Sequence, residues 1–272
     1  MKRSGLAVDP TVELRPVLSG PPVENSIVDK VSVTIIAFNE ESNIERCLES
    51  VKWADEIVVL DGHSEDRTVE LCRRFTDQVF QEDWNGFGRQ KNLCAARASH
   101  RWILNIDADE VVSSACAEEI RRELDKGPAH TVYRFPRKNY FGKRWVRYGG
   151  WYPDHIARFY DKTRAAFTET RVHEKLFPDT NAGVFNNPLE HYSYRDMAAY
   201  VARQNRYSTL FAQEMMERGK TAAWSDVCLR PPAAFMKSYL LRQGFREGFL
   251  GLFLAAAAGF YTFLKYAKTR PI

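Results

Sequence analysis

Cysteine, clustered charge and an N-terminal apolar run are all scarce in this 272-residue sequence, and each scarcity excludes a class of protein. Cysteine occurs five times, an odd number, and never as a CxxC pair, which argues against a disulfide framework or structural zinc and favours a reducing cytosol. The net charge is only +4 without a dense Lys/Arg run, so nucleic acid is not an expected partner. Residues 1–30 hold four prolines and no long apolar run, so we expect a disordered tail and no signal peptide.

The first half of the chain alternates between short apolar runs and segments with helical periodicity. The apolar runs predict four strands, at residues 31–38, 56–62, 78–80 and 101–107. A helix is expected after each of them, with Ser42 as a candidate cap of the first and a serine cap on the fourth. Strands that alternate with helices of about a dozen residues indicate an α/β fold with a mostly parallel central sheet.

The pattern changes after Gly127-Pro128. Residues 131–150 are typical of strand–turn–strand, and further strands are expected up to about residue 177. From about Tyr194 the chain has helical character, and Pro231-Pro232 marks a break. We therefore predict an α/β domain over 31–193 with an antiparallel insertion, followed by a helical region over 194–272.

Acidic residues follow three of the predicted strands. Asn39-Glu40 follow the first, Asp61 the second, and the run Asp107-Ala108-Asp109-Glu110 the fourth. In open α/β sheets, ligands bind outside the carboxyl ends of the strands. Asp107 and Asp109 point the same way in an extended segment, and two oxygen donors on one side suit Mg²⁺ or Mn²⁺. One acidic residue in such a place is usually a turn or a helix cap, but three clusters at one edge predict a ligand site.

Four of these segments occur in an order and at spacings that resemble family 2 glycosyltransferases of the GT-A fold, which is Rossmann-like. The segments are VTIIAFNEESNIERCLESV, EIVVLDGHSEDRTVEL, WNGFGRQKNLCAARAS and WILNIDADE. WYPDHIARFY, VHEKLF and EHYSYRDMAAYVARQNRYS further resemble bacterial lipopolysaccharide core β-1,4-glucosyltransferases. The resemblance extends over residues 31–268.

The resemblance implies a nucleotide-sugar donor, usually a UDP-sugar, bound with the help of a divalent cation. The residues that it assigns to the donor are Asn39, Glu40, Asp61, Lys91, Asp107 and Glu110. Asp61 is expected to face solvent at its strand end. Asp109 and Asp107 match the family's metal-binding DxD, and His173 is a further candidate ligand. Solvated or capping roles remain open for Lys91 and Glu110, since a lysine on a helix face and a charge at a helix N-terminus are common.

An inverting transferase needs a base that takes the proton of the acceptor hydroxyl. Glu174 is the preferred candidate and Asp154 the second. Trp151 and Tyr152 are candidates for an acceptor platform, because sugar rings pack on aromatic faces, although core packing explains most aromatic residues equally well. His191 is interpreted as a structural residue at the start of a helix.

The segment Gly248 to Leu264 has no charged residue and is slightly short for a membrane span, which needs about 20 residues. We expect a helix that packs on the domain or lies on the inner face of the cytoplasmic membrane. Lys265, Lys268 and Arg270 would then attract anionic lipid. A spanning helix and an ordinary buried helix remain alternatives.

The resemblance implies transfer of a hexose, with glucose expected, from a UDP-sugar to a lipid-anchored lipopolysaccharide core acceptor. Transfer to another lipid-linked, capsule or peptide acceptor is the alternative within enzymes. A silent nucleotide-sugar-binding membrane scaffold is the alternative of another class, and the retained Asp61, Asp107, Asp109 and Glu174 argue against it.

Overall fold

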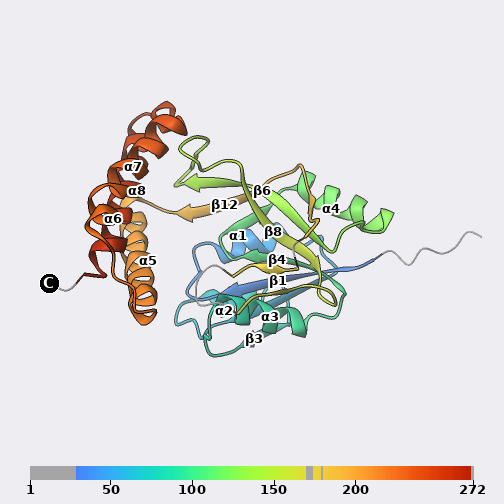
Figure 1. Ribbon diagram of the computed structural model, residues 1–272. Helices are drawn as coiled ribbons and strands as arrows, with labels where there is room; N and C mark the ends of the chain where they lie inside the picture. The colour runs from blue at the N-terminus through green and yellow to red at the C-terminus, as the bar shows by residue number, and fades with distance from the viewer. Residues whose placement is uncertain (1–28, 170–173, 179, 271–272) are drawn as a thin grey trace, which may run out of the picture.

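The computed structural model describes residues 29–169, 174–178 and 180–270. It consists of an α/β domain built on one large sheet and a stack of helices, α5 to α8, beside that domain (Figure 1). The strand β12 leads from the sheet to the stack. His173 lies outside the described residues.

The large sheet has ten strands in the order β3-β2-β1-β4-β8-β6-β12-β5, with β7 and β11 paired to β6. Its first four strands are parallel, whereas β8 is antiparallel to both β4 and β6. The predicted mostly parallel sheet with an antiparallel insertion is therefore confirmed. The strands are β1 (Val31–Ala37), β2 (Glu56–Asp61), β3 (Val79–Gln81), β4 (Trp102–Asp107), β5 (Glu110–Val112), β6 (Val132–Phe141), β7 (Arg144–Trp145), β8 (Asp154–Asp161), β11 (Gly183–Val184) and β12 (Leu189–Tyr194); β9 (Ala166–Phe167) and β10 (Leu176–Phe177) form a separate pair.

The helices of the α/β domain cover both faces of its parallel strands. They are α1 (Ile44–Glu49), α2 (Thr68–Cys72), α3 (Phe87–Arg97) and α4 (Ser114–Lys126). Ser113 caps α4 by accepting a hydrogen bond from the Cys116 amide, as the sequence predicts. The expected cap at Ser42 is wrong, because α1 begins one residue later, after Asn43, and has no side-chain cap.

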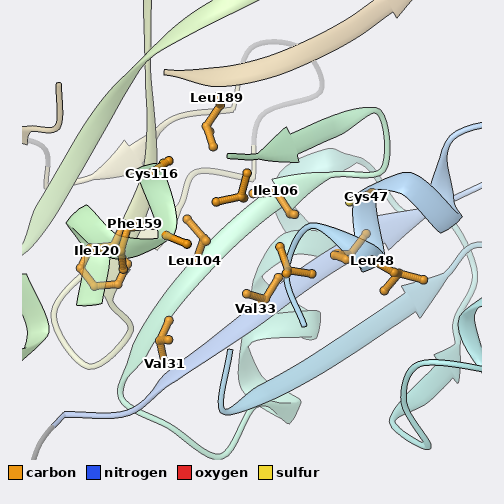
Figure 2. Close-up of a cluster of buried hydrophobic side chains, with 14 of the residues drawn as sticks. Val31, Val33, Cys47, Leu48, Leu104, Ile106, Cys116, Ile120, Phe159 and Leu189 are labelled. Carbon is orange, nitrogen blue, oxygen red and sulfur yellow. The ribbon is translucent and has the colours of Figure 1, made fainter. Parts of the chain in front are cut away.

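The main core lies between the sheet and helices α1 and α4 (Figure 2). All seven residues of β1 are buried, as expected for a central strand covered on both faces. Val31 and Val33 meet Leu104 and Ile106 of the neighbouring β4 in this cluster. Full burial of such side chains contributes about 1.5–3 kcal/mol each, so this core holds the strand ends in a fixed place.

The helical region begins directly after β12. Its elements are α5 (Met197–Glu217), α6 (Trp224–Cys228), α7 (Arg230–Met236), the π-helix η1 (Lys237–Leu241), the 3-10 helix η2 (Gly244–Glu247) and α8 (Phe249–Ala267). The predicted break at Pro231-Pro232 is the first turn of α7, where proline needs no amide hydrogen. By length and composition, α8 alone among the described helices is apolar enough to cross a membrane.

The cations that follow the apolar part of α8 are held by the protein itself. Lys268 Nζ donates to Asn205 Oδ1 at 2.7 Å and to Ser208 Oγ at 2.8 Å, both on α5. Arg270 Nη1 donates to the Ala222 carbonyl at 2.7 Å, and Lys265 Nζ lies 4.0 Å from the centroid of the Phe211 ring. These three side chains therefore do not form the free basic flank that the sequence suggested.

All five cysteines are free thiols, and only Cys228 is exposed. Burial raises the pKa of Cys72, Cys94 and Cys116 to about 12. It also raises the pKa of Cys47 well above its usual value. The four buried thiols are therefore inert packing groups at neutral pH.

Candidate active site

A cavity of about 1260 Å³ lies at the carboxyl ends of β1 and β4 and is closed on one side by α5. Its wall includes Glu40 after β1, the Asp107–Asp109 turn after β4, and Asp154 at the start of β8. His191 of β12 and Arg203 of α5 also line it. Residues that the sequence places at separate strand ends thus meet in one cavity, as open α/β sheets predict.

Asp107 lines this cavity, but two buried cations hold its carboxylate. Lys91 Nζ lies 3.2 Å from Asp107 Oδ1, and Arg158 Nη2 bonds to the other oxygen. Burial alone would raise the pKa of Asp107, but the charges of Arg158 and Lys91 outweigh it and hold that pKa far below its usual value. Asp107 is thus a fixed anion at the centre of a charge network.

Glu110 lies behind Asp107 and is fully buried. It accepts a hydrogen bond from the Asp107 amide at 3.0 Å and from Arg158 Nη2 at 2.9 Å, and Arg137 lies 3.3 Å away. It does not line the cavity, so in this structure its carboxylate fixes the turn between β4 and β5.

Asp109 and His191 lie next to each other on the cavity wall, with 3.3 Å between Asp109 Oδ2 and His191 Nε2. The other ring nitrogen of His191, Nδ1, lies 2.7 Å from both Asn139 Oδ1 and Ser193 Oγ, and these contacts hold the ring with Nε2 directed at Asp109. Burial alone would raise the pKa of Asp109, but the charge and hydrogen bond of His191 lower it. The assignment of His191 to the start of a helix is wrong, because it lies on β12, a strand that the sequence did not predict.

Two residues of the cavity wall, Asp109 and His191, are the candidates for holding a divalent cation. The described residues contain no group of three His, Cys, Asp or Glu side chains arranged for a metal. Asp109 and His191 nevertheless offer one oxygen and one nitrogen to an open cavity, and ions such as Mg²⁺ keep positions for phosphate oxygens and water. Asp107 is a weaker candidate ligand, because Lys91 and Arg158 already hold its oxygens.

The two candidate bases lie in different surroundings. Asp154 is on the cavity wall with 40% of its side chain exposed, and Arg137 holds one of its oxygens at 2.6 and 3.0 Å. Burial would raise the pKa of Asp154, but Arg137 outweighs it, so that pKa lies below its usual value. Glu174 is outside the cavity wall and accepts from Lys91 Nζ at 2.8 Å.

Two of the candidate donor residues, Asn39 and Asp61, hold loops in place. Asp61 is completely buried, so its expected position facing solvent is wrong: its carboxylate accepts from the Ser64 amide at 2.8 Å and from Gln81 Nε2 at 3.1 Å. The Asn39 side chain accepts from the Glu65 amide at 2.9 Å. Of Asn39, Glu40 and Asp61, only Glu40 lines the cavity.

Three aromatic side chains gather at the mouth of the cavity beside Glu40. Trp84 lies edge-on to Phe87, with ring centroids 4.9 Å apart, and 6.5 Å from Phe38. All three line the cavity and are at least 38% exposed. Large exposed apolar rings at a cavity mouth are typical of a stacking site for a flat ligand group.

The candidate acceptor residues differ in position. Trp151 lines the cavity, whereas Tyr152 lies edge-on to Trp145 at 5.2 Å and is not on the wall. Sequence analysis missed Arg203 and Arg206, whose spacing of three residues puts both on one face of α5. Both line the cavity, and that spacing was the signal that could have found them.

The model of family 2 glycosyl transferases matches residues 32–192, more than half of the chain and almost the whole α/β domain. The chain belongs to this family. The matched part contains the Asp107–Asp109 turn, Asp154 and His191. The family-2 chain is therefore a glycosyltransferase by membership, and its cavity is the candidate active site.

Known relatives of this family-2 chain include the lipopolysaccharide core biosynthesis glycosyltransferase LpsC of Rhizobium meliloti, which is 29% identical over 88% of this chain and 91% of the relative. A solved structure, TarS of S. aureus, covers 88% of this chain and 89% of its own at 15% identity, with a TM-score of 0.47. Glucosyl-3-phosphoglycerate synthase of Mycobacterium tuberculosis, crystallised with Mn²⁺ and UDP, covers 42% of this chain and 44% of its own at 22% identity, with a TM-score of 0.35.

Proposed function

We propose that the protein is an inverting, metal-dependent hexosyltransferase that moves glucose from UDP-glucose to a lipid-anchored lipopolysaccharide core acceptor. Family membership supports the transferase activity, and the similarity to a relative named for lipopolysaccharide core biosynthesis supports the acceptor class. Such an acceptor carries acyl chains, so the proposed place of the reaction is the inner face of the cytoplasmic membrane.

One observation carries the chemistry: Asp109 with His191 and Asp154 with Arg137 line the same cavity. The Asp109–His191 pair suits the departing diphosphate, and the Asp154–Arg137 pair offers a carboxylate to an incoming hydroxyl. Inversion requires that the nucleophile and the leaving group lie on opposite faces of the sugar, so the proposal assigns the two pairs to opposite faces of the bound sugar.

In the proposed reaction, the acceptor hydroxyl oxygen bonds to the anomeric carbon while the bond from that carbon to the UDP oxygen breaks. Asp154 takes the hydroxyl proton, and UDP leaves with the electron pair of the broken bond. Arg137 keeps Asp154 ionised and oriented, because it donates to that carboxylate from two nitrogens. Asp154 therefore replaces Glu174 as our preferred base.

The remaining cavity residues would bind the donor. Phe38, Trp84 and Phe87 offer rings to the base, and Arg203 and Arg206 offer cations to the phosphates. Asp109 and His191 would hold Mg²⁺ or Mn²⁺, which when bound supplies neutralisation of the charge that develops on the leaving diphosphate. Asp107, fixed by Lys91 and Arg158, positions the turn that carries Asp109.

The test is a donor screen with purified, delipidated core oligosaccharide as acceptor, with nucleotide release and the extended saccharide both measured. UDP-glucose is expected to give the fastest transfer, and excess chelator to abolish it until Mn²⁺ or Mg²⁺ is restored. Asp109→Asn is expected to lower the rate about 100-fold or more, the scale of a lost electrostatic stabiliser, without unfolding the protein. Glu118→Gln, an exposed position on α4, is the matched control. Full transfer in excess chelator, or a fully active Asp109→Asn, contradicts the proposed chemistry.

A further inference from the structure

An apolar surface is exposed where α7 is followed by η1, η2 and the start of α8. We call it the apical surface, and its apolar members are Met236, Leu240, Leu241, Phe245, Phe249 and Leu252. Leu241 and Phe249 are 79% and 73% exposed, the largest values among the exposed large hydrophobic residues of the described chain. These elements pack against one another, since Tyr239 lies edge-on to Phe245 at 6.3 Å. Single exposed apolar residues are ordinary, but a contiguous group of this kind marks an interaction site.

The charges on the apical surface have one sign. Lys237, Arg242 and Arg246 are exposed among its apolar side chains. The sole acidic residue between Met236 and Phe260 is Glu247, which is buried and turned inward. Its carboxylate accepts from Arg144 Nη2 at 2.8 Å and from the Arg147 amide at 2.8 Å. The surface therefore offers apolar groups and positive charge together, which is the pattern that binds anionic lipid headgroups.

The apical surface adjoins one wall of the active-site cavity. The Gly149 amide donates to the Arg242 carbonyl at 2.8 Å, and Ser238 Oγ donates to the Gly149 carbonyl at 3.3 Å. Gly150 and Trp151, which follow directly, line the cavity. A saccharide that projects from a surface touching η1 and η2 would therefore arrive beside this wall.

We propose that the apical surface docks on an anionic lipid bilayer, with Leu241, Phe245 and Phe249 inserted among the headgroups. The contact is peripheral, because α8 is packed within the helical stack. A Cβ on Gly259 would lie 3.1 Å from the Pro231 carbonyl of α7, and a Cβ on Gly251 would overlap the Gly244 carbonyl. A helix that crossed the bilayer would have to leave these contacts and those of Lys268 with α5. Lipid binding by this surface stands by itself; only its use for delivering a lipid-anchored acceptor rests on the proposed function.

Vesicle flotation of the full chain tests the proposal. Vesicles of phosphatidylcholine alone are compared with vesicles that also contain phosphatidylglycerol, at low and high salt. We expect binding to the anionic vesicles, weakening as salt rises, and little binding to the neutral ones. Salt-resistant attachment that also survives alkaline carbonate would overturn the proposal in favour of a spanning α8.

Two variants locate the contact. Lys237→Gln/Arg242→Gln/Arg246→Gln is expected to lower partitioning onto anionic vesicles about 100-fold, since each cation near an anionic surface contributes on the order of 1 kcal/mol. Leu241→Asp/Phe249→Asp is expected to abolish flotation with the anionic vesicles. Arg73→Gln/Arg122→Gln/Lys126→Gln removes three exposed cations of the α/β domain and is the matched control, with unchanged flotation.

Transfer to delipidated oligosaccharide separates this proposal from the proposed function. Both apical variants should retain it, because none of the changed side chains lines the cavity. Arg242 lies against Gly150 of the wall, and glutamine keeps the side chain there as far as Cδ. Normal flotation of both variants overturns the apical contact even if the enzyme is active. A wild-type dimer that does not float, and that Leu241→Asp converts to a monomer, overturns it in favour of contact with a second copy.

Discussion

Glu110 and Asp154 are two carboxylates that share one partner, Arg137, yet they lie in opposite environments. Glu110 has no exposed surface and is also held by Arg158, whereas 40% of the Asp154 side chain is exposed to the cavity. The first is surrounded by protein donors and fixes the turn that carries Asp109. The second keeps an oxygen available for a ligand. The comparison shows how one arginine can connect a structural anion with a reactive one.

The largest effect is expected when the buried charge network around Glu110 is disrupted. Arg158→Met leaves Asp107 and Glu110 in a buried site without their main cation, and losing one partner of such a network costs about 3–5 kcal/mol of unfolding free energy. Urea unfolding measures it. Arg97→Met breaks the half-exposed pair with Glu82 and should cost below about 1 kcal/mol. Equal losses in the two variants would show that the Arg158 network is no more stabilising than a surface pair.

The next largest effect is expected on the transfer rate when the exposed carboxylate of the comparison, Asp154, is replaced. Asp154→Asn keeps the shape of the side chain but removes its capacity to accept a proton, so transfer should fall about 100-fold or more while UDP affinity stays unchanged. Glu174→Gln should lower the rate less than about 10-fold, because its loss acts only through Lys91. Calorimetric titration with UDP and initial rates separate binding from chemistry. A reversed ranking of the two variants would restore Glu174 as the base.

The smallest effect is expected at Glu56, a third carboxylate for the comparison, which lies at the opposite end of the parallel strands. Glu56 has only neutral hydrogen-bond donors, including the Ser99 amide at 2.7 Å and Gln78 Nε2 at 2.8 Å. Burial alone would raise the pKa of Glu56, but these donors together with Ser32 lower it to about 2. Because the folded pKa is depressed, this stability is present above the unfolded pKa of about 4.3 and is lost as pH falls toward 2.

Glu56→Gln should therefore lower the unfolding free energy by about 1 kcal/mol at pH 7, a value reduced for solvent screening at this partly exposed site. The difference from the unsubstituted protein should vanish near pH 2. Urea unfolding as a function of pH measures both. A difference that is independent of pH would show that Glu56 acts through packing and not through its charge.

The alternating half of the fold could be predicted because its signals are local. Each buried run of β1, β2 and β4 is followed within a few residues by a polar strand end, and parallel strands bring those ends to one edge. The short strand β5 gave no such signal, because three residues carry too little periodicity. The capping role of Ser42 failed because its neighbour Asn43 precedes the first helical residue.

The charge network could not be predicted, because it joins residues distant in sequence. Lys91 reaches Glu174 across 83 positions, and His191 reaches Asp109 only because β12 pairs with β5. Asp61 was misplaced for a related reason: Ser64 and Gln81 satisfy its oxygens, so burial costs it little. Polar residues at strand ends predict that a site exists, whereas their partners depend on the tertiary fold.

Because the thiols differ in exposure, the protein can be labelled at a single cysteine. Cys228 is the exposed thiol, at the end of α6, whereas the four others are shielded inside the α/β domain. A maleimide dye at neutral pH should therefore attach once, within the helical stack, and no cysteine needs to be replaced first. Such a label would report by fluorescence when that stack meets a vesicle, in the same preparation whose catalysis is being followed.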